Sequence, residues 1–302
     1  MRTAVIDIGS NTLLLLVVEP TIDGLHPVVD LCRFGRLGKG LDASGALHAA
    51  SIAASLEICR EYRKVMSELG VAQIAIVGTA ALREATNSAD FVGPAEAILG
   101  APIEIIAGRR EADLAFAAVR HTFPDLAGSA YVVVDVGGGS TELVITDGAQ
   151  VVNAISLPIG AVRLTERHLK TDPPTREEIA ALEADIDRAI APVGLPSGIT
   201  VIGTAGTATT MAAMKLGLAQ HDPDAVTGLR LSPPVIAQQL ARLYAATVAH
   251  RKEIAGIAPE RADVIAAGVA IYARVVHAVN APAMITCDRG IRWGVAYERA
   301  AR

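Results

Sequence analysis

The chain contains two copies of one pattern, in which an apolar segment ends in Asp-x-Gly, a small polar turn follows, and a second apolar segment begins. The first copy is Ala4–Val18 and the second is Val132–Ile145. Apolar runs of this length, bounded by glycine-rich turns, are typical of buried β-strands. Their aspartates, Asp7 and Asp135, lie 128 positions apart. The pattern predicts two strand pairs of the same construction.

A second pair of segments repeats at nearly the same distance. Ile74–Ala80 and Thr200–Ala205 both run from an apolar strand into Gly-Thr-Ala, and their glycines lie 125 positions apart. Two matches in the same order at similar offsets indicate a duplicated domain. The boundary is predicted near Asp125–Gly128. This divides the chain into domains 1–126 and 127–302, with the last helix free to pack back on the first domain.

Helical patterns fill the intervals between these strands. Thr175 and Glu178 form a capping-box sequence, and Ser232-Pro233 has the character of a helix start. Strand pairs joined by tight turns and followed by alternating helices and strands predict an α/β fold with a mixed sheet in each half. The predicted helices are Ala46–Leu69, Thr175–Ile190, Ser232–Val248, Pro259–Asn280 and Arg289–Ala301.

Composition narrows the class of protein. The 302 residues are 51% hydrophobic and carry a net charge of −5, which excludes a disordered chain and argues against a nucleic-acid polymer as partner. The cysteines Cys32, Cys59 and Cys287 have no metal-ligand spacing, and scattered thiols fit a reducing compartment. With no export signal or bilayer-length apolar run at hand, the sequence predicts a cytoplasmic protein without a membrane partner.

Four turns rich in glycine, serine and threonine follow the predicted strands. Such turns expose backbone N–H groups with little obstruction, which suits them to bind phosphate. Any one of these turns alone can be explained as an ordinary hairpin turn with no role in phosphate binding. Two domain copies facing each other would bring all four to one cleft. The predicted phosphate-binding residues of the turns, with the aspartate before the first, are Asp7, Gly9, Ser10, Asn11, Thr12, Thr79, Gly137, Gly138, Gly139, Ser140, Thr141, Gly206 and Thr207.

Carboxylates adjoin two of these turns. Asp7 and Asp135 each stand near the end of an apolar strand, and Glu142 begins the strand after the second turn. A carboxylate buried there must be paired, solvated or metal-bound. Beside phosphates Mg²⁺ is the expected partner, so Asp135 and Glu142 are the predicted metal ligands. The alternative is that each aspartate caps its turn through the backbone.

Further motifs extend over nearly the whole chain. They are Asp7–Thr12, Gly78–Ala85, Asp135–Leu143, Leu157–Leu164, Gly203–Thr207 and Glu260–Ile265. Together they resemble the signatures of the exopolyphosphatase / guanosine pentaphosphate phosphohydrolase (Ppx/GppA) family. The resemblance implies two ribonuclease-H-like domains of the acetate and sugar kinase/Hsc70/actin superfold, with a central phosphate-binding cleft. It also implies a homodimer.

The resemblance also assigns a catalytic carboxylate. The family places it in a Gly-x-Glu-Glu-Ala segment, which here is Gly108-Arg109-Arg110-Glu111-Ala112. Glu111 therefore matches the catalytic glutamate, and Arg110 replaces the glutamate before it, adding a cation that should help to hold a polyanion. Arg83 stands where the family has a phosphate-binding arginine.

These residues predict a Mg²⁺-dependent exopolyphosphatase that releases terminal inorganic phosphate from polyphosphate. Glu111 deprotonates a water that attacks the terminal phosphorus in line. The first alternative is hydrolysis of the 5′-phosphate of guanosine pentaphosphate, with guanosine tetraphosphate as a further ligand. More distant alternatives are a small-molecule kinase of the same superfold and a non-catalytic sensor of polyphosphate or nucleotide.

A preference for short polyphosphate is also expected. Longer family members carry a helical, HD-like extension that lengthens the basic channel. This sequence ends at Arg302, soon after Gly290–Gly294, which resembles the family's closing Gly-Leu-Arg-x-Gly segment, so the extension is expected to be absent. The resemblance thus predicts short-chain substrates and distributive release.

Overall fold

Both copies of the repeated pattern fold as antiparallel strand pairs in a computed structural model, which describes residues 1–22 and 24–301. In the first copy, β1 (Thr3–Ile8) pairs with β2 (Leu13–Thr21). In the second, β6 (Tyr131–Val136) pairs with β7 (Thr141–Thr146). The predicted strand pairs are confirmed.

The turns inside the two pairs close with the same hydrogen bond. The N–H of Gly9 donates to the carbonyl of Thr12 at 2.9 Å, and the N–H of Gly137 donates to that of Ser140 at 3.0 Å. Donor and acceptor are each 128 positions from their counterpart. The repeat therefore extends from the sequence to the backbone geometry of the turns.

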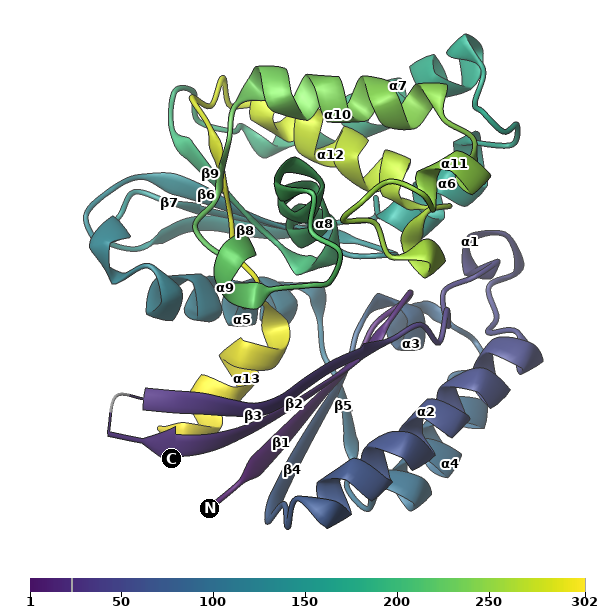
Figure 1. Cartoon of the computed structure of the whole chain (residues 1–302), viewed down its shortest axis with the longest axis vertical. Coiled ribbons are helices and arrows are strands. Elements are labelled where there is room, and N and C mark those ends of the chain that lie inside the picture. Colours follow the sequence, from purple (N-terminus) through teal and green to yellow (C-terminus); the bar gives the residue numbers. More distant parts are fainter. Residues whose placement is uncertain (23, 302) are drawn as a thin grey trace. The chain divides into compact units, whose positions relative to one another are not determined.

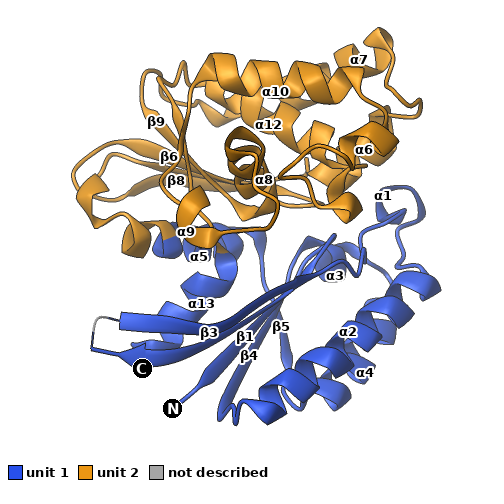
Figure 2. Ribbon diagram, in the orientation of Figure 1, with its two compact units in different colours: residues 1–118, 291–302 blue, residues 119–290 orange. Residues whose placement is uncertain are grey.

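The chain forms two compact units, shown in different colours in Figure 2. Unit 1 is Met1–Ala118 with Ile291–Arg302, and unit 2 is Val119–Gly290. The segment Asp125–Gly128 lies within unit 2. The final helix, α13 (Ile291–Ala300), is part of unit 1 because it packs on β1 and β2.

Unit 1 is built around a five-stranded sheet in the order β3-β2-β1-β4-β5, in which β1, β4 and β5 run parallel. Alternate residues of β1 contribute to two apolar clusters. Figure 1 shows α2 and α4 over one face of this sheet and α13 over the other. The remaining elements of unit 1 are β3 (Gly24–Arg33), α1 (Leu41–Ser44), α2 (Ala49–Glu68), β4 (Gln73–Gly78), α3 (Ala80–Glu84), α4 (Ala89–Leu99), β5 (Ile103–Ile105) and α5 (Gly108–Thr122), whose last residues belong to unit 2.

Unit 2 has a six-stranded sheet in the order β10-β11-β9-β6-β7-β8. Its strands β8, β7, β6, β9 and β11 repeat the order and directions of β3, β2, β1, β4 and β5, with β10 added at the edge. The elements of unit 2 besides β6 and β7 are η1 (Pro124–Leu126), β8 (Val151–Leu157), α6 (Ala161–His168), α7 (Arg176–Ile190), η2 (Ala191–Val193), β9 (Thr200–Thr204), α8 (Ala205–Leu216), α9 (Pro223–Val226), β10 (Arg230–Leu231), α10 (Pro233–Ala245), α11 (Val248–Arg251), η3 (Pro259–Arg261), α12 (Ile265–Ala278) and β11 (Met284–Thr286).

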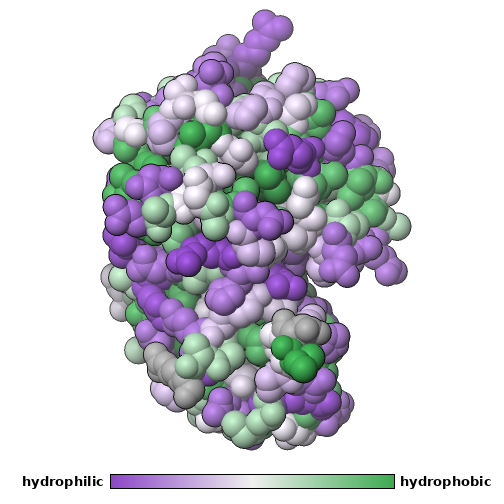
Figure 3. Space-filling model, turned by 90° about the vertical axis from the view of Figure 1, so that its left-hand side faces the viewer, coloured by the Kyte–Doolittle hydropathy of each residue, from purple (hydrophilic) through white to green (hydrophobic). Residues whose placement is uncertain are grey.

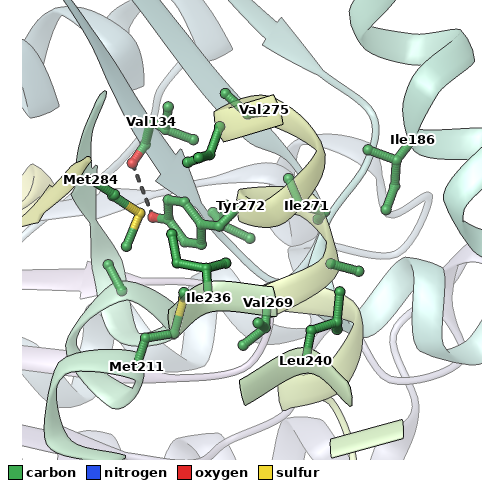
Figure 4. Packing of buried hydrophobic residues seen from close by; sticks show 14 of the residues in the cluster. Val134, Ile186, Met211, Ile236, Leu240, Val269, Ile271, Tyr272, Val275 and Met284 are labelled. Atoms are coloured by element: carbon green, nitrogen blue, oxygen red, sulfur yellow. Dashed lines mark hydrogen bonds between the residues drawn. The ribbon is translucent and has the colours of Figure 1, made fainter. Parts of the chain in front are cut away.

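This shared topology confirms the predicted duplication. Each unit has the strand order and strand directions of a ribonuclease-H-like sheet, as expected. The core of unit 2 lies between its sheet and helices α7, α8, α10 and α12. Figure 4 shows Tyr272 of α12 among aliphatic and methionine side chains of this core, with its hydroxyl at the carbonyl of Val134.

Two helix boundaries test the sequence predictions. The capping box of Thr175 and Glu178 is present and begins α7, so that prediction is confirmed. The single helix predicted through Val248 is wrong, because α10 ends at Ala245 and α11 follows. The hydroxyl of Thr247 accepts a hydrogen bond from the N–H of His250, so Thr247 caps a new helix instead of continuing the old one.

The surface mixes residue types. On the face drawn in Figure 3, hydrophilic residues are interspersed with hydrophobic ones. Within residues 1–22 and 24–301, we find no helix with the length and apolar character needed to cross a bilayer.

Candidate active site

In unit 1, the predicted base and the predicted phosphate-binding arginine form an ion pair. One guanidinium nitrogen of Arg83, Nη1, donates to Glu111 Oε1 at 2.5 Å and to the carbonyl of Ile106 at 2.7 Å. The side chain of Glu111 is 3% exposed and that of Arg83 is 29% exposed. Burial of a carboxylate is costly unless a cation or hydrogen-bond donors compensate it. Arg83 supplies both and still reaches solvent.

The backbone brings these two side chains together. β1 and β4 are parallel neighbours, so their carboxyl ends lie at the same edge of the sheet, and α3 with Arg83 begins there. The N–H of Ile106 donates to the carbonyl of Gly78 at 2.9 Å, which holds the segment before α5 against the end of β4. Glu111 lies in the first turn of α5, where its N–H donates to Ala107.

The first phosphate turn lies at the same edge. Asp7 is buried near the end of β1, and the N–H of Thr79 donates to the carbonyl of Ile8 at 3.1 Å. Unit 1 thus brings Asp7, the turn Gly9–Thr12, Thr79, Arg83 and Glu111 to one edge of its sheet.

A basic loop is fixed beside this turn. The N–H of Gly38 donates to the carbonyl of Ser10 at 2.7 Å, and that of Arg36 donates to Asn11 at 3.0 Å. A Cβ on Gly38 would lie 2.7 Å from the Cβ of Ser10, so glycine is needed for this close approach. The loop therefore holds Arg36 and Lys39 near the turn.

In unit 2, the predicted metal ligands are cross-strand partners. Asp135 of β6 pairs with Glu142 of β7, and their exposures are 5% and 2%. Directly opposed residues on antiparallel strands point to the same face of the sheet. Asp135 Oδ2 accepts a hydrogen bond from Thr204 Oγ1 at 2.7 Å, and Glu142 Oε1 accepts one from Ser156 Oγ at 2.7 Å.

These two carboxylates fit Mg²⁺. A hydroxyl donor uses only part of the acceptor capacity of a carboxylate, and two buried carboxylates on one face favour a cation between them. Mg²⁺ typically takes one or two protein carboxylates and completes its shell with water and phosphate oxygens. Among the described residues, 1–22 and 24–301, no group of three or more His, Cys, Asp or Glu side chains is arranged to hold a metal ion.

Tyr272 contacts both β6, which carries Asp135, and the neighbouring strand β9. Its hydroxyl lies 2.5 Å from the carbonyl of Thr204 and 3.0 Å from that of Val134. Complete burial raises the pKa of Tyr272 well above its ordinary value, which keeps the phenol protonated and able to donate. The hydrogen bonds thus run from Tyr272 to the Thr204 backbone and from the Thr204 hydroxyl to Asp135.

The second glycine turn is held by the start of α6. The carbonyl of Gly137 accepts from the N–H of Ala161, that of Gly138 from the N–H of Val162, and that of Gly139 from Arg163 Nε, at 2.8–2.9 Å. In a planar trans peptide the next N–H points opposite to the carbonyl. The N–H groups of residues 138–140 therefore point away from α6, as a phosphate cradle requires.

The last glycine turn involves a residue that sequence reasoning missed. Ala205 at the start of α8 has φ = 62°. The guanidinium of Arg261 packs against the next residue so closely that a Cβ on Gly206 would clash with it. Arg261 stands within the Glu260–Ile265 motif, and a basic residue there was the available signal. Thr207 is buried, and its hydroxyl lies against Gly268 of α12.

Arg110, the cation in place of the family's usual glutamate, is itself paired. It donates through Nη1 to Glu298 Oε1 at 2.7 Å and through Nη2 to Oε2, so both nitrogens engage one carboxylate of α13. These residues are 188 positions apart, and no sequence pattern connects them.

Comparisons with known proteins show the family of the chain. The model of the Ppx/GppA phosphatase family matches residues 16–302. "Exopolyphosphatase 2" of Mycobacterium tuberculosis is 34% identical over 285 residues, which cover 89% of this chain and 88% of that protein. "Guanosine-5′-triphosphate,3′-diphosphate pyrophosphatase" of Vibrio cholerae is 31% identical over 303 residues, 98% of this chain but 58% of that protein.

The fold comparison gives the same result. The crystal structure of the Aquifex aeolicus member of the Ppx/GppA family superposes with a TM-score of 0.83 at 31% sequence identity, covering 100% of this chain and 98% of that one. The match of the family model over almost the whole chain is decisive: this chain belongs to the Ppx/GppA phosphatase family.

Proposed function

We propose that the protein is an exopolyphosphatase, which hydrolyses the terminal phosphoanhydride bond of inorganic polyphosphate. The observation that carries the proposal is the buried Glu111 carboxylate, held by Arg83 at the sheet edge where two glycine turns also lie. The 34% identity to a protein named exopolyphosphatase supports polyphosphate as the substrate.

In the proposed reaction, Glu111 accepts a proton from the attacking water through its carboxylate. Arg83 is partly exposed, and its guanidinium can give a phosphoryl oxygen the donors that it does not use on Glu111 and Ile106. The backbone N–H groups of the glycine turns bind further phosphoryl oxygens. Their pre-oriented dipoles stabilise the charge that develops there as water bonds to the terminal phosphorus and the bond to the shortened polyphosphate breaks.

Asp135 and Glu142 are the proposed ligands of Mg²⁺. When bound, the ion would neutralise charge on the phosphates and orient them. Thr204 and Ser156 orient the two carboxylates through their hydroxyls. Cytoplasmic location and a homodimer remain predictions from the sequence.

Guanosine pentaphosphate is the second candidate substrate. The Vibrio cholerae relative, whose name describes hydrolysis of that nucleotide, is 31% identical. The glycine turns and Glu111 serve either substrate, because both present a terminal phosphoanhydride.

A phosphate-release assay with Mg²⁺ tests the proposal, with short polyphosphate, long polyphosphate, guanosine pentaphosphate and ATP compared side by side. Polyphosphate is expected to give the highest kcat/KM. The variant Glu111→Gln should lower kcat by about 10²–10⁴-fold, because it removes the proton acceptor, while polyphosphate still binds. Glu68→Gln, on the exposed surface of α2, is the matched control and should keep full activity.

Three results would contradict the proposal. Unchanged turnover in Glu111→Gln would remove Glu111 as the base. Faster hydrolysis of guanosine pentaphosphate than of polyphosphate would select the alternative substrate. Phosphate transfer from ATP to an acceptor other than water would indicate a kinase.

A further inference from the structure

The C-terminal helix α13 is attached to the helix that carries the proposed base. Arg110 of α5 and Glu298 of α13 form a two-pronged ion pair in which each side chain is about one-third exposed, 38% and 34%. Its hydrogen bonds to Glu298 raise the pKa of Arg110. The neighbouring ion pairs of α5 do not involve α13: Glu111 pairs with Arg83 of α3, and Arg109 pairs with a residue of α5 itself.

Two more contacts fix α13 in register. The backbone of Gly294 touches that of Leu114 so closely that a Cβ on Gly294 would clash with the Leu114 carbonyl. At the start of α13, Arg292 donates to Asp30 of β3 through Nε at 3.0 Å and through Nη2 at 2.9 Å. α13 is therefore anchored to the sheet at one end, touches the middle of α5, and reaches the first turn of α5 through Glu298.

The first turn of α5 is the place where such a contact matters. Glu111 follows Arg110 directly, and its carboxylate must meet Arg83. Terminal helical turns lack part of their backbone hydrogen bonds and fray most readily. Successive residues on an α-helix point about 100° apart, as 3.6 residues complete one turn. An anchor on Arg110 therefore limits how far the first turn of α5 can rotate or unwind. Such movement would carry Glu111 away from Arg83.

We propose that Arg110 is a positioning residue for the hydrolytic reaction, and that Glu298 of α13 acts through it to hold the first turn of α5 with Glu111 aimed at the reacting phosphate. The inference rests on the proposed function, since it takes Glu111 as the base. This role also accounts for Arg110, which stands where the family usually has a glutamate.

The pair is expected to affect the rate far more than the stability. A partly exposed ion pair contributes little net stability, because solvent screens it and ordering two long side chains costs entropy. Displacement of a catalytic group by about 1 Å can lower the rate by about 10²-fold. Loss of the pair should thus appear in kcat, with little change in KM or in the melting temperature.

The test is a charge swap between the two helices. Arg110→Glu and Glu298→Arg, each alone, place like charges together and should lower kcat for polyphosphate by about 10-fold or more. The double variant Arg110→Glu/Glu298→Arg restores an opposite-charge pair and should recover kcat to within a few-fold of the parent chain. Glu298→Gln only weakens the pair, so its kcat should lie between that of the single charge-swap variants and that of the parent chain. It keeps the test valid if a charge-swap variant folds poorly.

Arg109→Glu is the matched control. It makes the same change in charge one residue earlier on α5, but its partner Asp113 is on α5 itself, at 3.0 Å. It should keep its kcat, and any rise in KM that it shares with Arg110→Glu reports the lost positive charge alone. Circular dichroism and melting temperature check folding of all variants.

The outcomes separate this inference from the proposed function. A loss of kcat in the single variants with recovery in the double variant supports the positioning role. If the single variants keep kcat, or the double variant fails to recover while it remains folded, the positioning role is wrong. If Glu111→Gln itself turns over normally, the proposed base fails independently of any result with Arg110.

Discussion

At the scale of single residues, Thr204 connects the core of unit 2 to a proposed metal ligand. Its carbonyl receives the buried Tyr272 hydroxyl, and its own hydroxyl donates to Asp135. One rotamer of the Asp135 carboxylate is thereby favoured before any ion binds. Preorganisation of this kind typically changes metal affinity by about 10–100-fold when a supporting group is removed.

Thr204→Val should therefore weaken Mg²⁺ binding while it preserves the shape of the side chain. The Mg²⁺ concentration for half-maximal phosphate release is expected to rise by about 10-fold or more, with activity largely recovered at saturating Mg²⁺. Thr200→Val, at the opposite end of β9, is the control. An unchanged Mg²⁺ dependence in Thr204→Val, or full activity of the parent chain in excess chelator, would exclude this role.

The roles of some site residues can be predicted from sequence motifs, whereas the partners of others cannot. Glu111 and Arg83 are named by motif resemblance, and the structure joins them in one ion pair. Arg110 is recognisable as a departure from the motif, but its partner lies on a helix at the other end of the chain. A pairing that depends on tertiary contact between distant segments leaves no local pattern, and the same holds for Tyr272.

At the scale of elements, the turn Gly137–Thr141 and the start of α6 form one packed unit. Gly160 lies against the backbone of Gly138 and Gly139, where a Cβ would clash with fixed main-chain atoms instead of a movable side chain. The same contact lets α6 bind the carbonyls of the turn.

Gly160→Ala should push α6 away from this turn. We expect a loss of about 1–3 kcal/mol in the free energy of unfolding, the usual range for an overpacked site, together with a rise in KM for polyphosphate. Gly93→Ala is the control, since a Cβ added to Gly93 in α4 would meet no atom within 4 Å; it should stabilise the protein by about 0.4–1 kcal/mol. Denaturant unfolding and steady-state kinetics measure both effects. Equal stability of the two variants would contradict the packing argument.

Elements with strong local signals are those that the sequence predicts. The Asp-x-Gly strand pairs and the Thr175 capping box are of this kind. The break between α10 and α11 escapes prediction because Thr247 lies within an apolar helical pattern, and its capping role depends on the chain turning there.

At the scale of the whole molecule, charge is expected to set how the substrate is released. The chain has a net charge of −5, and the cations identified near the glycine turns are few: Arg36, Lys39 and Arg83 in unit 1, and Arg163 and Arg261 in unit 2. Phosphates farther than a Debye length from these groups, about 8 Å at physiological salt, gain little attraction. Extra phosphate units should therefore stop adding affinity after the first few.

We therefore predict distributive digestion, in which the enzyme dissociates between cleavages. Gel electrophoresis of a partial digest of long polyphosphate should show the whole population shortening gradually. Intact long chains beside fully degraded ones would show processive digestion and contradict the prediction.

The position of α13 in unit 1 also affects the order in which the protein is completed during synthesis. Ile291, Trp293, Val295 and Ala296 fill an apolar cluster with residues of β1, β2, β4 and α5. A ribosome makes the strands of that cluster first, then all of unit 2, and the residues that close the cluster only afterwards. Unit 2 can thus finish folding while that face of the unit 1 sheet is covered only in part, by α5. Until α13 is made, the apolar residues of this cluster in the first-translated half stay open to chaperones and proteases.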